Sequence, residues 1–128
     1  MERDMKTRVT SKICMIKDLG VHGKLFGGNM LAWMDEAAAI YARQLTGTDM
    51  VVTMRFGEIR FSTPVKHEDI VEFYCSNPRP GTTSLSFEIS AEVNSIMVFS
   101  TDCTFVHLDK DGKKQKIDWD KSALKEQD

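Results

Sequence analysis

The residues best suited to chemistry lie close together in one segment, from His22 to Glu36. Two adjacent glycines, Gly27 and Gly28, open a strongly apolar run, and that run contains an acid, Asp35. If the run is a helix, its first amides have no partner within the helix, and the glycines leave them accessible to a ligand oxygen. Burying a carboxylate without a partner is costly, so an acid among apolar neighbours suggests a purpose. An acid beside free N–H donors can activate a nucleophile and stabilise an oxyanion.

Helical geometry separates the two acids of this segment. At about 100° per residue, Asp35 shares its helix face only with small or apolar residues. These neighbours are Gly28, Leu31, Ala32, Ala38, Ala39 and Ala42. Glu36 aligns instead with Asn29 and Arg43, which form a polar stripe. We therefore expect Asp35 to be catalytic and Glu36 to be structural or solvated. In the alternative interpretation, the glycine pair is only a helix entry and Asp35 pairs with a neighbouring chain.

These residues must be positioned by a helix that the pattern predicts over about residues 28–45. Gly47 suits a left-handed stop at its end, and a helix apolar on nearly every side is usually enclosed. A strand is expected over about residues 5–16. After the helix the period changes to two, which predicts four strands between about residues 50 and 108. They are expected at Met50–Phe61, Ile70–Ser76, 85–93 and 96–108, with a hairpin turn at Asn94–Ser95, and a charged tail follows over 109–128, helical or disordered from Asp118.

This order of elements predicts a single α+β domain over residues 1–128. One apolar helix with one antiparallel sheet suggests a sheet that curls around the helix, which is the hotdog fold. Such a sheet leaves an edge uncovered, so we expect a homodimer, which could assemble further into a tetramer or hexamer.

Composition excludes several classes of function. The chain is 41% hydrophobic and 28% charged with a formal net charge of −2, so nothing favours nucleic acid as a partner. No stretch approaches the roughly 20 apolar residues that span a membrane, and the charged start of the chain does not resemble a secretion signal. Cys14, Cys75 and Cys103 lie in apolar runs, as reduced core cysteines do. We expect a cytoplasmic protein without a metal site, since no His, Cys and Asp spacing suggests one.

The segment His-Gly-Lys-Leu-Phe-Gly-Gly-Asn-Met-Leu-Ala-Trp-Met-Asp-Glu resembles the signature of the hotdog acyl-CoA thioesterases, above all the broad-specificity bacterial enzymes. That signature runs Asn-x-x-Gly-x-x-Phe-Gly-Gly and then Met-Asp. Arg60–Val65 is similar to the family's Phe-x-x-Pro strand end, and Gly81–Ser84 to its Gly-x-Ser/Thr-Ser turn. The likeness covers about residues 8–108. It departs at Gly20, which stands where the family has asparagine, and at His67-Glu68-Asp69, where the family often has a glycine.

The resemblance implies an enzyme that hydrolyses acyl-CoA to free acid and CoA. No cofactor is needed, because CoA is part of the substrate. Asp35 would act as general base on water or attack the thioester directly. Amides near Gly27 and Gly28 would hold the thioester oxygen. His22 is either a turn residue or an active-site group beside Asp35 of the opposite subunit, where it could replace the missing asparagine.

The CoA part of the substrate requires cations for its phosphates. Candidates at strand ends or turns are Arg55, Arg60, Lys66 and Arg79. Thr83 and Ser84, in the turn that resembles the family's, could bind pantetheine.

Two other functions are compatible with the sequence. A hydroxyacyl-thioester dehydratase of the same fold would pair His22 with Glu36, although this loop lacks the prolines of those enzymes. A non-catalytic acyl-CoA-binding module would not need Asp35.

Overall fold

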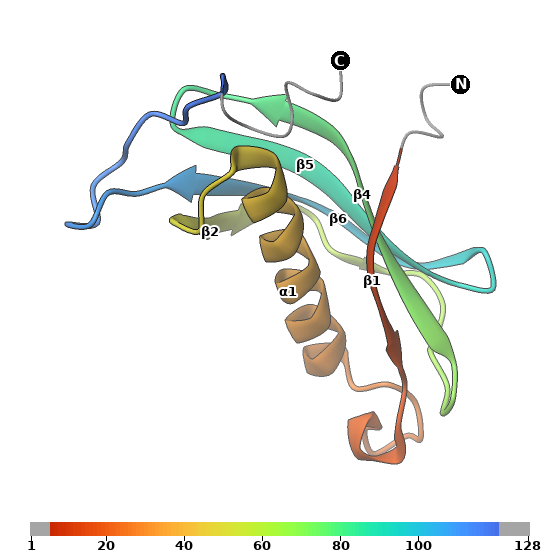
Figure 1. The fold of residues 1–128 in the computed structure, drawn as a ribbon. Coiled ribbons are helices and arrows are strands. Elements are labelled where there is room, and N and C mark those ends of the chain that lie inside the picture. Colours follow the sequence, from red (N-terminus) through yellow and green to blue (C-terminus); the bar gives the residue numbers. More distant parts are fainter. Residues whose placement is uncertain (1–5, 121–128) are drawn as a thin grey trace.

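The computed structural model describes residues 6–120, which form one sheet and one long helix (Figure 1). In chain order the elements are β1 (Thr7–Ile13), the 3-10 helix η2 (Ile16–Asp18), α1 (Gly27–Thr46), β2 (Val51–Phe56), β3 (Arg60–Phe61), β4 (Ile70–Pro80), β5 (Ser84–Val93) and β6 (Ile96–His107).

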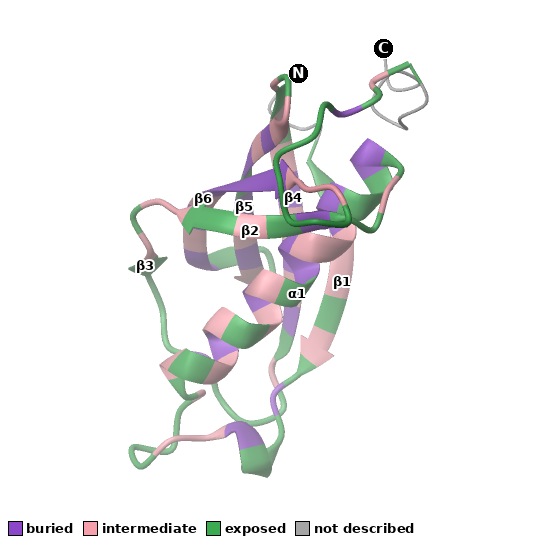
Figure 2. Cartoon of the chain, turned by 90° about the vertical axis from the view of Figure 1, so that its left-hand side faces the viewer, coloured by how far each residue is buried: buried purple, intermediate pink, exposed green. Residues whose placement is uncertain are grey.

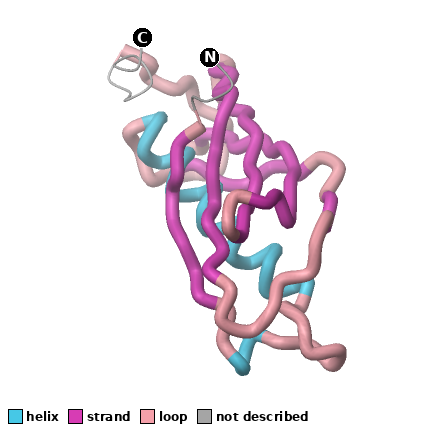
Figure 3. Tube along the Cα trace, turned by 90° about the vertical axis from the view of Figure 1, so that its right-hand side faces the viewer, coloured by secondary structure: helices cyan, strands magenta, loops and turns pink. Residues whose placement is uncertain are grey.

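The sheet is antiparallel, with strand order β1-β4-β5-β6-β2, and β3 pairs with β6 beside β2. Figures 1 and 3 show α1 lying against one side of this twisted sheet. Side chains alternate along β4, β5 and β6, so every second one faces the helix. The largest fully buried side chains include Phe73, Phe87, Phe99 and Phe105 from these strands and Met34 from α1. The α+β hotdog fold is thus confirmed.

The helix is covered on one side only. Ala37, Ala38, Tyr41 and Ala42 are buried towards the sheet, while the opposite side of α1 carries exposed and half-buried residues (Figure 2). The expectation of a helix enclosed on nearly every side is therefore wrong for one chain, because a single layer of sheet covers a single helix face.

Two predicted strands have different bounds in the structure. The run expected at Met50–Phe61 is broken into β2 and β3 around Gly57, whose amide donates to the Asp102 carbonyl at 2.8 Å. The strand expected to stop at Ser76 continues as β4 to Pro80, with a register shift between Ser76 and Arg79. A proline has no N–H to donate and is tolerated at such an irregularity.

The expected chain reversals are confirmed. Gly47 ends α1 in the left-handed region with φ 76°, and Asn94 and Ser95 have positive φ in the turn between β5 and β6. The first strand ends at Ile13 rather than near residue 16, because the 3-10 helix η2 begins at Ile16. Asp118 lies in an irregular segment that reaches residue 120 without a helix, and the rest of the expected tail, 121–128, lies outside the described residues.

The predicted core cysteines, Cys14, Cys75 and Cys103, are buried and form no disulfide. Burial raises the pKa of the Cys103 thiol to about 12, as expected for an unreactive thiol. Within residues 6–120, no helix is long and apolar enough to cross a membrane.

Candidate active site at the start of the long helix

The first turn of α1 has two amides that donate to no residue in 6–120. Phe26 is the N-cap residue and provides no side-chain hydrogen bond to the helix. Its carbonyl accepts from the amides of Asn29 at 3.0 Å and Met30 at 3.2 Å. The amides of Gly27 and Gly28 donate to no other residue in the described part of the chain. A helix usually begins with Ser, Thr, Asp or Asn, which satisfy such donors, so this start leaves two N–H groups for a ligand.

The two glycines have different steric surroundings. A Cβ at Gly28 would lie 2.8 Å from Cε2 of the Phe26 ring, so any side chain there would displace this exposed ring. Among residues 6–120, a Cβ at Gly27 would meet only Phe61, at an ordinary 3.7 Å. Nothing in the chain's own packing therefore explains glycine at position 27, whereas close approach of a ligand to the backbone would.

Asp35 is held by a residue that the sequence does not single out. The hydroxyl of Thr53, in β2, donates to Oδ1 of Asp35 at 2.9 Å, and both residues are half-buried. A lone hydroxyl between Val52 and Met54, in an otherwise apolar run, is the signal that could have identified Thr53. The register of β2 against β6 shifts between Thr53 and Arg55, and such bulges are over-represented next to active sites.

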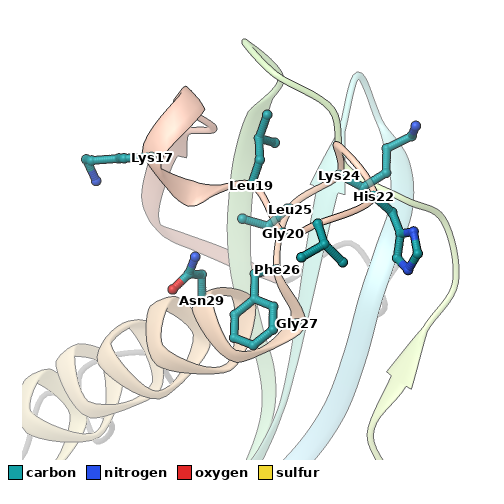
Figure 4. A pocket seen from close by; sticks show the side chains of 10 residues that line it. Lys17, Leu19, Gly20, His22, Lys24, Leu25, Phe26, Gly27 and Asn29 are labelled. Carbon is teal, nitrogen blue, oxygen red and sulfur yellow. The ribbon is translucent and has the colours of Figure 1, made fainter.

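Glu36 and His22 have more solvated surroundings. Glu36 is exposed and pairs with Lys12, Oε1 to Nζ 3.4 Å. His22 is exposed near the tip of the loop before α1 and makes no hydrogen bond or ion pair with any residue in 6–120. It lines a hollow of about 730 Å³ together with Lys24 and Gly27 (Figure 4). In one chain, neither His22 nor Glu36 is paired with the other or with Asp35.

Asp18 anchors this loop to the helix start. Its carbonyl oxygen accepts from the Phe26 amide at 3.0 Å and from Nδ2 of Asn29 at 2.9 Å. Its buried carboxylate accepts from the Met15 amide at 2.9 Å and from Nζ of Lys17 at 3.0 Å. These hydrogen bonds hold the pKa of Asp18 below its ordinary value, the Met15 amide most of all. The orientation of the Gly27 and Gly28 amides is thus fixed by the loop that precedes them.

A second hollow, of about 350 Å³, lies on another side of Gly27. Its lining is mainly apolar and includes Met30, Phe61, Val65 and Val98. The Phe61 ring is 55% exposed and packs edge-on against Phe99, with ring centroids 5.2 Å apart.

The predicted CoA-binding cations do not gather around Asp35. Arg60 and Arg79 line a polar hollow of about 540 Å³ on the sheet face opposite α1. Arg55 also lies on that face of the sheet. Its Nη1 is 3.2 Å from Oδ2 of Asp102 and donates to Oγ1 of Thr104 at 3.1 Å.

The other predicted CoA contacts lie elsewhere. Lys66, in the loop after β3, does not line that hollow. Thr83 lies in the turn between β4 and β5, and Ser84 is the first residue of β5. Within residues 6–120, no group of three or more His, Cys, Asp and Glu side chains could hold a metal ion.

Comparison with known proteins points to one family. The model of the thioesterase superfamily matches residues 22–99. The acyl-CoA thioester hydrolase YciA of Salmonella typhimurium is 30% identical over 118 residues, which cover 85% of this chain and 88% of that protein. Cj0915, a hexameric hotdog fold thioesterase of Campylobacter jejuni, superposes with a TM-score of 0.80 at 31% identity and covers 93% of each chain.

The fold is shared more widely. HI0827, a hexameric broad specificity acyl-coenzyme A thioesterase, matches with a TM-score of 0.86 at 23% identity over 94% of this chain and 93% of that one. Its likeness supports the architecture, while the family assignment rests on the closer sequence matches. This chain therefore belongs to the thioesterase superfamily and, within it, to the hotdog acyl-CoA thioester hydrolases.

Proposed function

We propose that this enzyme hydrolyses the thioester of acyl-CoA with Asp35 as general base. The observation that carries the proposal is the Thr53–Asp35 hydrogen bond, which fixes a carboxylate on a helix face of small and apolar residues. The carboxylate takes a proton from water, and the water oxygen attacks the thioester carbon. The CoA thiolate leaves, and the free acid forms.

The amides of Gly27 and Gly28 stabilise the oxyanion that develops on the thioester oxygen. Their lack of partners in the described chain and the absence of steric need for glycine at position 27 support this role. Losing one oxyanion donor typically costs on the order of 100-fold in rate or more. The apolar hollow beside Gly27 gives the acyl chain a place near the same amides.

The active site is shared between two copies of the chain. Gly27 and Asp35 are separated by eight residues of α1, a rise of about 12 Å, so one thioester group cannot contact both in a single chain. The Gly27 amide of one subunit therefore works with Asp35 of a second copy. The edge strand β2, with Val52 and Met54 exposed at 45% and 51%, supplies an apolar edge for this pairing. A homodimer is the minimal active unit, and it assembles into a hexamer as its relatives do.

The decisive experiment follows CoA release from an acyl-CoA panel with a thiol reagent. The native enzyme should release CoA, and Asp35→Asn should release it at least 100-fold more slowly while still binding the substrate. A dehydratase would instead form an enoyl product without free CoA, and a binding module would bind without turnover. Near-native hydrolysis by Asp35→Asn would refute the role of Asp35.

Subunit mixing tests the shared site. An Asp35→Asn subunit and an inactive Gly27 variant should each be inactive alone. After joint refolding, half of randomly formed dimers are mixed, and each mixed dimer has one intact site. About a quarter of the native activity should then return. If Asp35 and Gly27 act within one chain, mixing restores nothing.

A further inference from the structure

The apolar hollow beside Gly27 has one side that belongs to the protein core. Met30, Val65 and Val98 line it, and each is no more than 3% exposed. The backbone there is fixed as well, because the Ser62 amide donates to the carbonyl of Val98 at 2.9 Å. Side chains in a close-packed core move little without strain, so this side of the hollow is rigid.

The ring of Phe61 forms another wall of the same hollow. Phe61 lies in β3, a short exposed strand that pairs with β6 (Figure 2). Its ring packs edge-on against Phe99, which is fully buried and blocks movement of the ring in that direction. The Phe61 ring is thus held at the hollow by a contact with the core.

The Phe61 ring also lies close to the proposed oxyanion amide of Gly27. Its Cζ is 3.7 Å from the position that a Cβ on Gly27 would take, which is ordinary van der Waals contact. Since an acyl carbon needs about 3.5–4.0 Å to each atom that it contacts, it cannot lie between the ring and the Gly27 backbone. An acyl group whose carbonyl oxygen is held by this amide must therefore pass along the ring, with the carbon next to the thioester beside it.

The lining of the hollow suits an uncharged hydrocarbon chain. No Asp or Glu of residues 6–120 lines it, and the charged side chain in this lining, Lys24, is exposed to solvent. Each methylene group that leaves water for an apolar surface strengthens binding about fourfold. The acyl chain therefore gains by following the hollow, while the Phe61 ring and the core side chains limit its width.

We propose that Phe61 is a specificity-determining residue, which restricts the substrate to acyl groups without a branch at the carbon next to the thioester. A straight chain presents only hydrogen atoms to the ring at this carbon. A methyl branch there would press against the core side of the hollow or against the ring, whose displacement Phe99 opposes. The proposal rests on the proposed acyl-CoA hydrolysis, because it takes the Gly27 amide as the site of the thioester oxygen.

The test compares butanoyl-CoA with its branched isomer 2-methylpropanoyl-CoA, which has the same number of carbon atoms. In the native enzyme kcat/KM should favour the straight isomer about 10-fold or more, since one misplaced methyl group in an apolar pocket is worth this much. Phe61→Ala removes the ring and should reduce the ratio to about 3-fold or less, mainly by raising kcat/KM for the branched isomer. Ile70→Ala is the control of matched exposure. Ile70 is 53% exposed at the start of β4 and does not line the hollow, so this variant should keep the native ratio.

A second variant covers the case in which Phe61→Ala weakens the packing on Phe99. Phe61→Leu keeps an apolar contact in a smaller side chain, and its ratio should lie between those of the native enzyme and of Phe61→Ala. Equal hydrolysis of both isomers by the native enzyme, or a native ratio retained in both Phe61 variants, would overturn the role of Phe61. If the native enzyme releases CoA from neither isomer, the proposed reaction fails instead. Calorimetric Kd values of the two isomers in the same variants then show, by the same comparison, whether Phe61 discriminates between them.

Discussion

The side chain of Thr53 holds the carboxylate of Asp35 from a different element, with 2.9 Å between Oγ1 and Oδ1. Asp35 lies in the middle of α1, and Thr53 lies in β2 at the sheet edge. This bond links the helix that carries the acid to the edge where a second subunit would join. It fixes one carboxylate oxygen and leaves the other for water.

Replacing Thr53 tests whether this bond serves catalysis. Thr53→Val keeps the shape and the preference for a strand but removes the donor, so stability should fall by no more than about 1.5–3 kcal/mol, the contribution of a hydrogen bond to a charged group. Without this bond the carboxylate is no longer held in position towards water, so kcat should fall tenfold or more. Thr53→Ser should restore most of the rate. Thr10→Val in β1 is the control, and a native rate in Thr53→Val would show that Asp35 needs no such support.

Alanine substitutions at Gly27 and Gly28 should show which glycine is needed for ligand contact and which is needed for packing. Gly27→Ala meets no close atom, so its free energy of unfolding should be unchanged or raised by up to about 1 kcal/mol. Its rate of CoA release should nevertheless fall at least tenfold, because the added methyl group occupies the approach to the amide. Gly28→Ala should instead displace the Phe26 ring. This displacement would change the near-ultraviolet circular dichroism in the region where phenylalanine absorbs. A fully active Gly27→Ala would contradict the oxyanion role.

The break between β2 and β3 should depend on the space at Gly57. An alanine Cβ there would lie 2.1 Å from Oδ1 of Asp102, which pairs with Arg55. Gly57→Ala should therefore push the Asp102 carboxylate away from Arg55 and cost up to about 1 kcal/mol of stability in urea unfolding, the value of an exposed ion pair. In an Asp102→Ala background the obstacle is gone, so the same substitution should cost much less. Equal costs in the two backgrounds would exclude the side-chain clash as the cause.

Acid should remove the contribution of Asp18 to stability. The Met15 amide and Lys17 lower the pKa of this carboxyl in the folded protein below its ordinary value of 3.8. A lowered pKa means that the charged form stabilises the fold above the ordinary value, and that this stabilisation is lost as pH falls through the folded pKa. Asp18→Asn should thus unfold at lower urea than the native enzyme at pH 7, with the gap closing in acid. Asp111→Asn, in an exposed turn, should show no gap, and a gap for Asp18→Asn that persists in acid would contradict the linkage.

Much of the fold followed from local pattern. The helix was expected at residues 28–45 and spans Gly27–Thr46, and the turns at Gly47 and Asn94–Ser95 are as expected. Each depends on short-range rules, namely helical periodicity, a left-handed stop and a hairpin turn, so neighbouring residues suffice to predict it.

Local pattern could not predict the break between β2 and β3, or the face of the sheet on which each cationic side chain lies. By alternation alone, Thr53 and Arg55 would point to the same face of β2. The bulge between them reverses that parity, so Thr53 meets Asp35 on the helix side while Arg55 meets Asp102 and Thr104 on the opposite face. A bulge depends on which strand lies alongside, and that pairing joins residues about fifty positions apart in the chain.

The sequence by itself determined the family signature, the apolar helix with its glycine start, and the choice of Asp35 over Glu36 as catalytic candidate. These features are local, because residues a few positions apart on one helix have a fixed geometry. Only the tertiary structure brought Thr53 to Asp35, left the Gly27 and Gly28 amides without partners among the described residues, and brought the Trp119 indole to the Gly81 carbonyl. Those relationships depend on how β2, the loop before α1 and the segment after β6 pack against the sheet, and packing between distant segments is decided by the whole fold.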